Sequence, residues 1–215
     1  MIGTEICCGA AKNKAEQRRE RVTSAARKLF IDNGFHATGI AQIAKESGVA
    51  VGQLYRDFSC KEDIVAAIVN TDCRTFMACE SLRTAIENGD QIRTREWIHQ
   101  FIGTDEDDED GERLFAEIVA EAGRNARIAA IFNDINDDMR ILMLDALAML
   151  APDDSLADRR VALTDTVLTM SLGLMLHHLI RPRLDVSPLL AALHAIIDCE
   201  IDALQAAAQT VPLPA

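Results

Sequence analysis

The sequence predicts an all-α protein, with an N-terminal three-helix helix-turn-helix domain followed by a larger α-helical domain. Apolar residues recur at three- and four-residue spacing along most of the 215-residue chain, which is the period of a helix with one buried face. Aromatic residues make up only 4%, and the 11 Gly and 5 Pro are few, which favours a helical protein built on Leu, Ile, Ala and Met. Two short helical patterns also meet at a glycine turn behind a supporting helix, which is the helix-turn-helix arrangement.

The N-terminal domain carries three predicted helices. Residues 1–14 show no periodicity and are expected to form a flexible arm. The first helix follows the arm and ends at Gly34, which supplies a left-handed stop. Thr38 is the expected N-cap of a short second helix that ends at Gly48, and a third short helix is expected over 50–58.

The larger domain contains six further predicted helices. They cover 61–87, 92–102, 112–122, 126–150, 156–180 and 188–208. The last two are apolar around most of their circumference, so they need cover on several sides. One small domain cannot cover both, and we therefore expect a homodimer through the last two helices. The predicted domains are 15–62 for the helix-turn-helix and 63–215 for the helical remainder.

An acidic run, Asp105 to Asp110, lies between two of these helices. We interpret it as a solvated loop that leads into a helix, whose positive N-terminal end favours carboxylates. A calcium-binding loop is the alternative, but the spacing is not that of an EF-hand and no Gly lies in mid-loop. We therefore expect no metal here.

The charge of the chain is divided unevenly. Residues 1–65 hold ten Lys and Arg against eight Asp and Glu, whereas residues 66–215 hold twelve against twenty-six. The net charge of −12 therefore comes entirely from the larger domain. Because phosphate repels an acidic surface, any contact with DNA must come from the N-terminal segment.

Several classes of protein are unsupported by the sequence. Six cysteines show no CxxC or Cys/His ligand spacing, which favours free thiols in a reducing cytoplasm. No signal peptide is evident, and the apolar run 167–180 is shorter than the roughly 20 residues of a membrane span, so no membrane partner is expected. No Ser/His/Asp order, phosphate loop or metal motif indicates an enzyme. We expect a cytoplasmic protein with no catalytic residues and no cofactor.

An ordered set of residues in the N-terminal domain is more specific than the helix pattern. It consists of Ala25-Ala26-x-x-Leu29-Phe30, Gly34-Phe35, Thr38-x-Ile40-x-x-Ile43-Ala44, Gly48-Val49 and Gly52-x-Leu54-Tyr55-x-x-Phe58-x-x-Lys61. In spacing and in residue type this set resembles the TetR family of transcriptional regulators, over about a fifth of the chain. The resemblance implies a domain that binds double-stranded operator DNA.

The resemblance also implies which residues touch the DNA. They are Thr38, Gln42, Gly52, Gln53, Tyr55, Arg56 and Lys61. In that family the second short helix enters the major groove, so Gln53 and Arg56 are expected to contact base edges, where Gln pairs with adenine and Arg with guanine. Gly52 would let this helix approach closely.

The remaining residues of the set match positions that grip phosphates. Thr38, Tyr55 and Lys61 have this expected role, and Gln42 is expected to reach the groove edge or a phosphate. Three arginines, at positions 18, 19 and 21, have two open interpretations, which are additional backbone contacts and a solvated helix face.

Two positions depart from the family pattern. Ala50 stands where Ser or Thr often caps the recognition helix, which loses a cap worth about 1 kcal/mol. Cys60 stands before Lys61 where the family usually has Ser, Asn or Asp, so Ser59 is the alternative cap. A thiol near a helix N-terminus and a lysine can have a lowered pKa, which gives the hypothesis of a thiol sensor. The alternative is an incidental small residue.

The larger domain resembles the family only in architecture, in which variable helices enclose a ligand and a final pair forms the dimer. The candidates for contact with a small-molecule effector are Trp97, Phe101, Phe115, Phe132, Met139, Met143, Met170 and His178. Met-rich linings suit adaptable apolar pockets, although each of these residues could equally be ordinary core. The resemblance implies a ligand-responsive homodimeric repressor that a small apolar or amphipathic molecule releases from its operator. A transcriptional activator or a thiol-redox-sensing regulator on the same fold is the alternative.

Overall fold

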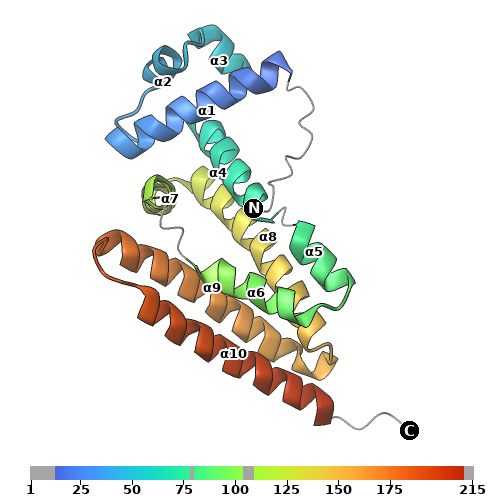
Figure 1. Ribbon diagram of the computed structural model, residues 1–215. Helices are drawn as coiled ribbons and strands as arrows, with labels where there is room; N and C mark the ends of the chain where they lie inside the picture. The colour runs from blue at the N-terminus through green and yellow to red at the C-terminus, as the bar shows by residue number, and fades with distance from the viewer. Residues whose placement is uncertain (1–12, 78–79, 104–108, 211–215) are drawn as a thin grey trace, which may run out of the picture. The chain divides into compact units, whose positions relative to one another are not determined.

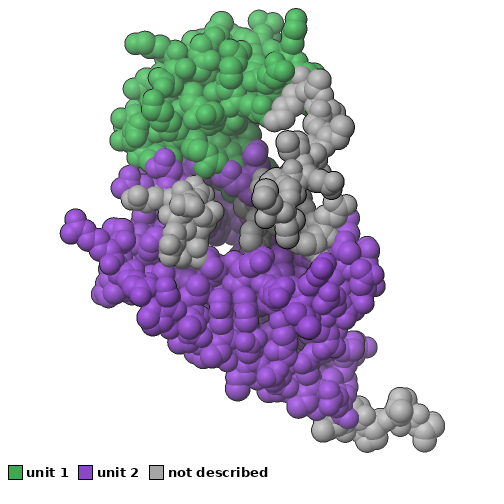
Figure 2. Space-filling view, in the orientation of Figure 1, with its two compact units in different colours: residues 1–70 green, residues 71–215 purple. Residues whose placement is uncertain are grey.

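The structure is a computed structural model that describes residues 13–77, 80–103 and 109–210. Every regular element in these ranges is a helix, which confirms the predicted all-α class. The chain divides into two compact units, residues 1–70 and 71–215, which are coloured separately in Figure 2. We call the first unit the head and the second the body. The division falls inside a helix, beyond the functional boundary expected at residue 62.

The head begins with α1, Lys14–Asn33, which lies across α2 and α3 in Figure 1. Asn13 caps this helix, because its side chain accepts from the backbone of Ala15 and Glu16 while Glu16 accepts from the Asn13 N–H. This reciprocal capping box satisfies donors that a helix start leaves unpaired. The expectation of an arm over 1–14 is therefore wrong at residues 13 and 14, and residues 1–12 lie outside the described part of the chain.

The two short helices of the head are α2, Ile40–Ser47, and α3, Val51–Asp57. Gly48 joins them at φ 66°, a left-handed conformation that a side chain disfavours, so the predicted glycine turn is confirmed. The predicted N-cap of α2 is wrong, since Gly39 holds that position and Thr38 lies before it.

The head has its own apolar core. Its most buried side chains are Val22, Ala26, Phe30, Phe35, Ile43, Leu54, Phe58, Ile64, Val65 and Ile68. They come from α1, α2, α3, the first turns of α4 (Lys61–Met77) and the segments that follow α1 and α3, and the rings of Phe30 and Phe35 lie 5.5 Å apart. Packing of α1 against α2 and α3 thus fixes which side of α3 faces outward.

The rest of the chain forms α5 (Glu80–Glu87), α6 (Gln91–Ile102), α7 (Glu109–Ala122), α8 (Ala126–Leu150), the 3-10 turn η1 (Asp154–Leu156), α9 (Ala157–Ile180) and α10 (Ser187–Thr210). Of the helix predicted over 61–87, the structure describes α4 and α5, and residues 78 and 79 between them lie outside the described ranges. Helix α5 packs against α6 and α8. Of the acidic run, residues 105–108 lie outside the described ranges, and Glu109 and Asp110 begin α7.

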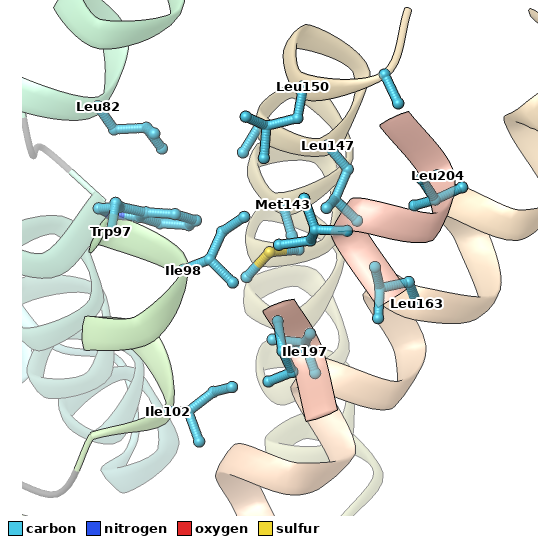
Figure 3. Close-up of a cluster of buried hydrophobic side chains, with 14 of the residues drawn as sticks. Leu82, Trp97, Ile98, Ile102, Met143, Leu147, Leu150, Leu163, Ile197 and Leu204 are labelled. Atoms are coloured by element: carbon cyan, nitrogen blue, oxygen red, sulfur yellow. The ribbon is translucent and has the colours of Figure 1, made fainter. Parts of the chain in front are cut away.

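The core of the body lies where α5, α6, α8, α9 and α10 meet. Figure 3 shows Trp97 and Ile98 of α6 facing Met143 and Leu147 of α8, with Ile197 of α10 beside them. All five side chains are at most 3% exposed. A buried arginine adds to this core, since Arg160 of α9 donates to the carbonyl oxygens of Ala151 and Asp153 at 2.7 Å each. These bonds hold the turn that joins α8 to α9.

Helices α9 and α10 run side by side in Figure 1 and leave apolar surface uncovered. Ile180 is 76% exposed and Ile196 is 49% exposed. An 18-residue window between Asp154 and Ile180 has a mean hydropathy of 1.2 and is only 22% buried, so by length and composition alone it would pass as a membrane span. A core helix of a soluble protein passes the same test, so this helix alone is weak evidence for a membrane span.

Candidate nucleic-acid interface

Helix α3 has a buried side and an outward side. Leu54 and Phe58 are at most 2% exposed and anchor α3 to the head. On the outward side Tyr55 is 53% exposed, Arg56 is exposed and Gln53 is half-buried. The Arg56 Nε donates to the carbonyl oxygen of Gly52, 3.3 Å away. The predicted base-contacting residues therefore share one accessible face.

Gly52 lies within this face and has no internal reason to be glycine. Its φ is that of an ordinary residue, and a Cβ added there would meet no atom within 4 Å. A mid-helix glycine costs up to about 1 kcal/mol relative to alanine. Neither packing nor backbone conformation within the head requires glycine at position 52. A requirement for glycine there would come from a partner that approaches α3 from outside.

The starts of the two short helices are capped differently. Gln42 accepts from the Gly39 N–H at 2.6 Å, so this predicted groove contact also closes the first turn of α2. Ala50 holds the N-cap position of α3 and makes no side-chain cap bond, as expected from its missing hydroxyl. Backbone donors at the start of α3 are thus left for a ligand or for water.

Thr38 and Lys61 are engaged within the head. Thr38 is 1% exposed, and its hydroxyl lies 3.0 Å from the carbonyl oxygen of Leu29 and 2.9 Å from that of Gly34. The Lys61 ammonium donates to the carbonyl oxygens of Phe35 and Thr38 and lies 3.9 Å from the centre of the Phe35 ring. Thr38 therefore fixes the end of α1, while Lys61 fastens the segment before α2 to the start of α4.

Two of the three N-terminal arginines have a role that neither sequence interpretation included. Arg18 of α1 makes a two-pronged ion pair with Asp57 of α3, Nε to Oδ2 at 2.5 Å and Nη2 to Oδ1 at 2.9 Å. Arg19 donates to the Asp57 carbonyl oxygen at 2.6 Å and lies 4.2 Å above the Phe58 ring. Both side chains tie α1 to the end of α3, and Arg21 lies on an exposed helix face as one interpretation expected.

Asp57 is a residue that sequence reasoning missed. The guanidinium of Arg18 lowers the pKa of its carboxyl below the ordinary value, and the charge of Arg19 adds to the effect. No local pattern in the sequence points to Asp57, because Arg18 lies 39 residues away along the chain.

Cys60 does not have the environment that a reactive thiol needs. Burial is the main cause that raises its pKa, and the nearby carboxylates of Glu62 and Asp63 raise it further. The Asp63 carboxylate accepts from the Ser59 N–H at 2.9 Å. The expected lowering of the pKa of Cys60 is therefore wrong.

In the body, four effector candidates belong to the main core or its edge. Trp97 and Met143 are 3% and 0% exposed within the cluster of Figure 3, and half-buried Phe101 and Met170 pack against it. Trp97 and Phe101 have ring centres 5.9 Å apart. Burial of this kind is what the core requires, so these four need no ligand to explain them.

Three other candidates, with a residue that the sequence did not single out, form polar and aromatic contacts between helices. Phe115 of α7 and Phe132 of α8 have ring centres 5.5 Å apart. His178 of α9 lies 2.9 Å from the carboxylate of Glu112 on α7, and both side chains are nearly buried. Met139 is half-buried on α8. No sequence pattern distinguished Glu112, because it follows an acidic run.

A second histidine pair lies on α6 and α10. The rings of His99 and His194 are stacked, with centres 4.2 Å apart and planes 6° apart. His99 lies 3.0 Å from Asp198, which also contacts Arg95 at 3.3 Å. Within the described ranges no group of three or more His, Cys, Asp or Glu side chains is arranged to hold a metal ion.

Two comparisons with known proteins bear on this interface. Residues 22–68 match the family model of bacterial regulatory proteins of the tetR family. Over 124 residues the chain is 32% identical to the HTH-type transcriptional regulator UidR of Escherichia coli strain K12, covering 57% of this chain and 61% of UidR. It is also 31% identical over 104 residues to the HTH-type transcriptional activator FasR of Mycolicibacterium smegmatis, covering 47% of each chain.

Solved structures extend the likeness to the whole fold. Salmonella enterica GusR superposes with a TM-score of 0.67 and 20% sequence identity, over 90% of this chain and all of GusR. A likeness at this identity concerns the fold, and it includes the helices of the body.

Together these findings define a helix-turn-helix domain of the kind that bacterial transcription regulators carry. Residues 22–68 match the tetR family of bacterial regulatory proteins. The chain spans less than two thirds of the length of UidR and about half that of FasR. Those relatives are transcriptional regulators, a class that is not known as enzymes.

Proposed function

We propose that the protein is a homodimeric repressor that binds operator DNA through α3 and is released by a small apolar or amphipathic molecule. It would act in the cytoplasm, where operator DNA is accessible. Base edges would be contacted by Gln53 and Arg56, with Tyr55 and Lys61 at the phosphates. Thr38 supports the interface from behind, because its hydroxyl is committed to the end of α1.

The outward face of α3 is the observation that carries this proposal. It combines accessible Gln53, Tyr55 and Arg56 with a glycine whose missing side chain no contact within the head requires. The charge distribution supports the same surface, since only the N-terminal 65 residues carry a positive net charge.

Fluorescence anisotropy with DNA from upstream of the gene tests the DNA-binding step. We expect selective binding that weakens steeply as salt rises, because phosphate contacts displace condensed counterions. An Arg56→Ala variant should lose about 1–3 kcal/mol of preference for one base pair, whereas Arg113→Ala on the body removes the same charge and should not. Binding that is equally tight to unrelated DNA would contradict a sequence-reading role.

The uncovered faces of α9 and α10 support a dimer. The outward side of α10 exposes Leu189, Ala192, Ile196, Cys199 and Ala203 at helical spacing. Such a row of apolar and small residues favours close packing against a second copy. Two heads on one two-fold axis would then contact half-sites about 34 Å apart.

Light scattering tests the dimer directly. Ile196→Glu places a carboxylate on the uncovered face and should give a monomer that binds operator weakly. Ile141→Glu is the matched control, because Ile141 on α8 is 59% exposed and lies outside α9 and α10. A wild-type chain that is monomeric at micromolar concentration would contradict this part of the proposal.

Release by a ligand is supported by the group of Phe115, Phe132, Glu112 and His178, which combines aromatic surface with a nearly buried polar pair. A ligand shifts the equilibrium only if it favours the conformation that does not bind DNA. We would screen apolar and amphipathic molecules for release of labelled operator. Phe132→Ala should lose the response, and the surface variant Ile141→Ala should keep it.

Activation of transcription is the second candidate, because the relative FasR is named a transcriptional activator. Repressors and activators share this fold, so the fold does not show whether the protein lowers or raises transcription. A reporter gene placed behind the upstream DNA decides between them. Deletion of the regulator should raise reporter expression if the protein represses and lower it if the protein activates.

A further inference from the structure

We propose that Val51, the first residue of α3, contacts the 5-methyl group of a thymine and so makes that methyl group part of what the protein recognises in its operator. This inference rests on the proposed function, in which α3 meets the base edges of DNA. It adds to Gln53 and Arg56 a residue that offers no hydrogen bond and would act through apolar contact alone.

Val51 is an exposed apolar side chain in the head. It is 43% exposed, and Tyr55, one helical turn further along α3, is 53% exposed. Between residues 13 and 70, all other large hydrophobic side chains are buried or half-buried. The large apolar groups that this part of the head leaves to solvent therefore lie on the helix that is proposed to meet DNA.

The position of Val51 matters more than its exposure, because single apolar side chains are common on protein surfaces. In a helix-turn-helix the N-terminal residues of the recognition helix are the ones that contact base edges. Val51 begins α3, whereas the buried side chains that anchor this helix, Leu54 and Phe58, lie further along the chain. The head thus leaves the Val51 end of α3 accessible.

Both neighbours of Val51 are small. Ala50 and Gly52 are exposed, and a Cβ added to Gly52 would meet no atom within 4 Å. Of these three successive exposed residues, only Val51 has a side chain that extends beyond Cβ. Its branch at Cβ leaves one strongly preferred rotamer in a helix, which holds both methyl groups in place before any contact is made.

The chemistry of a valine side chain selects among the bases. In the major groove adenine, guanine and cytosine present donors and acceptors, whereas thymine presents one acceptor and a 5-methyl group. Against the first three bases, an apolar side chain would displace water from polar atoms without replacing their hydrogen bonds, which costs free energy. Against the methyl group of thymine it buries two apolar surfaces together, which is favourable. Thymine is therefore the base that Val51 matches.

The first test removes the methyl group from the DNA. Preferred sites are selected from a randomised DNA library with the full-length chain, and anisotropy is then measured on a labelled duplex of the selected sequence. Each thymine is replaced singly by deoxyuridine, which lacks only the 5-methyl group. At one thymine of a half-site, the replacement should weaken wild-type binding about fourfold, the ratio that corresponds to one buried methyl group.

The second test removes the methyl groups from the protein. Val51→Ala should bind the thymine duplex more weakly than the wild type and should no longer distinguish thymine from deoxyuridine at that position. Its binding to unrelated DNA should keep the wild-type salt dependence, because valine neutralises no phosphate. Its melting temperature should not fall, since the side chain is exposed and alanine is the better helix former.

The control is Ile141→Ala, which removes an exposed apolar side chain from α8 of the body. It should keep the full difference between thymine and deoxyuridine.

A third test adds a methyl group to the DNA. The thymine that Val51 contacts is replaced by cytosine in one duplex and by 5-methylcytosine in another. The wild type should bind the methylated duplex about fourfold more tightly than the unmethylated one, again the ratio for one buried methyl group. Val51→Ala should bind the two duplexes equally.

The outcomes distinguish this inference from the proposed function. If the wild type selects no sequence, the proposed function fails, and this inference fails with it. If the wild type is selective but its site contains no thymine, or no deoxyuridine replacement weakens binding, only the inference is overturned. It is also overturned if Val51→Ala keeps the difference between thymine and deoxyuridine, because another residue would then contact the methyl group.

Discussion

The head and the body both use charged side chains to join helices, but they differ in the groups that those side chains meet. In the head, carboxylates pair with basic side chains of α1, as half-buried Asp57 does with Arg18 and exposed Glu46 with Lys28. In the body, Arg160 is buried on two carbonyl oxygens and Glu112 meets His178, while Arg140 and Asp165 pair at the surface. Exposed pairs contribute little to stability, whereas a buried charge is costly to leave without its partner. The pairs of the head therefore mainly hold α2 and α3 against α1, whereas the buried charges of the body are part of its core.

The division into head and body also explains which part of the chain resembles its relatives in sequence and which part resembles them only in fold. The family model covers residues 22–68, which are the head, while the likeness to GusR covers 90% of the chain at 20% identity. Turn glycines and helix spacings in the head are local requirements that recur in sequence. The body needs only apolar residues of suitable size at helical spacing, which many sequences satisfy.

The largest effect is expected from the core of the body. Leu147→Ala removes a side chain that is 1% exposed between α6 and α10, and it should lower the free energy of unfolding by about 2–5 kcal/mol. Urea denaturation followed by circular dichroism measures the loss. Ile141→Ala on the same helix is the control, because a 59% exposed side chain should change the free energy by no more than about 0.5 kcal/mol. Equal effects of the two variants would show that this cluster does not hold the body together.

Gly52→Ala tests whether the outward face of α3 is adapted to a partner outside the head. A Cβ meets no atom within 4 Å there, so alanine should raise the stability of the head by up to about 1 kcal/mol. The same methyl group should lower affinity for operator by about tenfold or more, because it stands between α3 and the groove. Melting temperature and anisotropy should therefore move in opposite directions.

Gly173 of α9 provides the corresponding test in the body. It too is exposed, with no atom within 4 Å of an added Cβ. Gly173→Ala should stabilise the isolated chain, while any loss of function should appear in self-association rather than in base preference.

The Gly52 prediction has a clear contrary outcome. If Gly52→Ala binds operator as tightly as the wild type, Gly52 has no role in close approach to DNA.

The sequence was sufficient for the helices and for the outward face of α3, because both follow from the apolar period and from turn glycines. The sequence was not sufficient to predict which of several possible partners a side chain contacts. Thr38 looked like a helix cap but bonds to the end of α1, and Arg18 looked like a DNA contact or a solvated residue but pairs with Asp57. Such choices depend on residues 9 to 39 positions apart, which no local pattern records.

An acid-sensitive contact is expected between α6 and α10. Burial lowers the pKa of His194 below its ordinary 6.5, and the charge of stacked His99 lowers it further, although Asp198 and a bond to the His99 carbonyl oppose this. The unfolded chain therefore takes up a proton at a higher pH than the folded chain does. Stability should begin to fall as the pH drops below about 6.5, and the loss should be complete below the lowered pKa.

Melting temperatures between pH 7.5 and pH 5 measure this effect. His194→Gln should remove part of the decline, because the group that takes up the proton is gone. His99→Gln should relieve it in part, since it removes the neighbouring charge while Arg95 still holds Asp198. A decline that is identical in the wild type and in His194→Gln would assign the acid sensitivity to other groups.

The smallest effect is expected at Cys60, where the head again uses a side chain for structure. The thiolate is the reactive form of cysteine, and burial raises the pKa of Cys60, so less thiolate is present at neutral pH than in an ordinary cysteine. Peroxide should therefore change operator affinity to the same extent in the wild type and in Cys60→Ser. Anisotropy measured before and after peroxide treatment checks this. A loss of affinity that appears only in the wild type would revive a redox role for Cys60, whose thiol is half-buried at the start of α4.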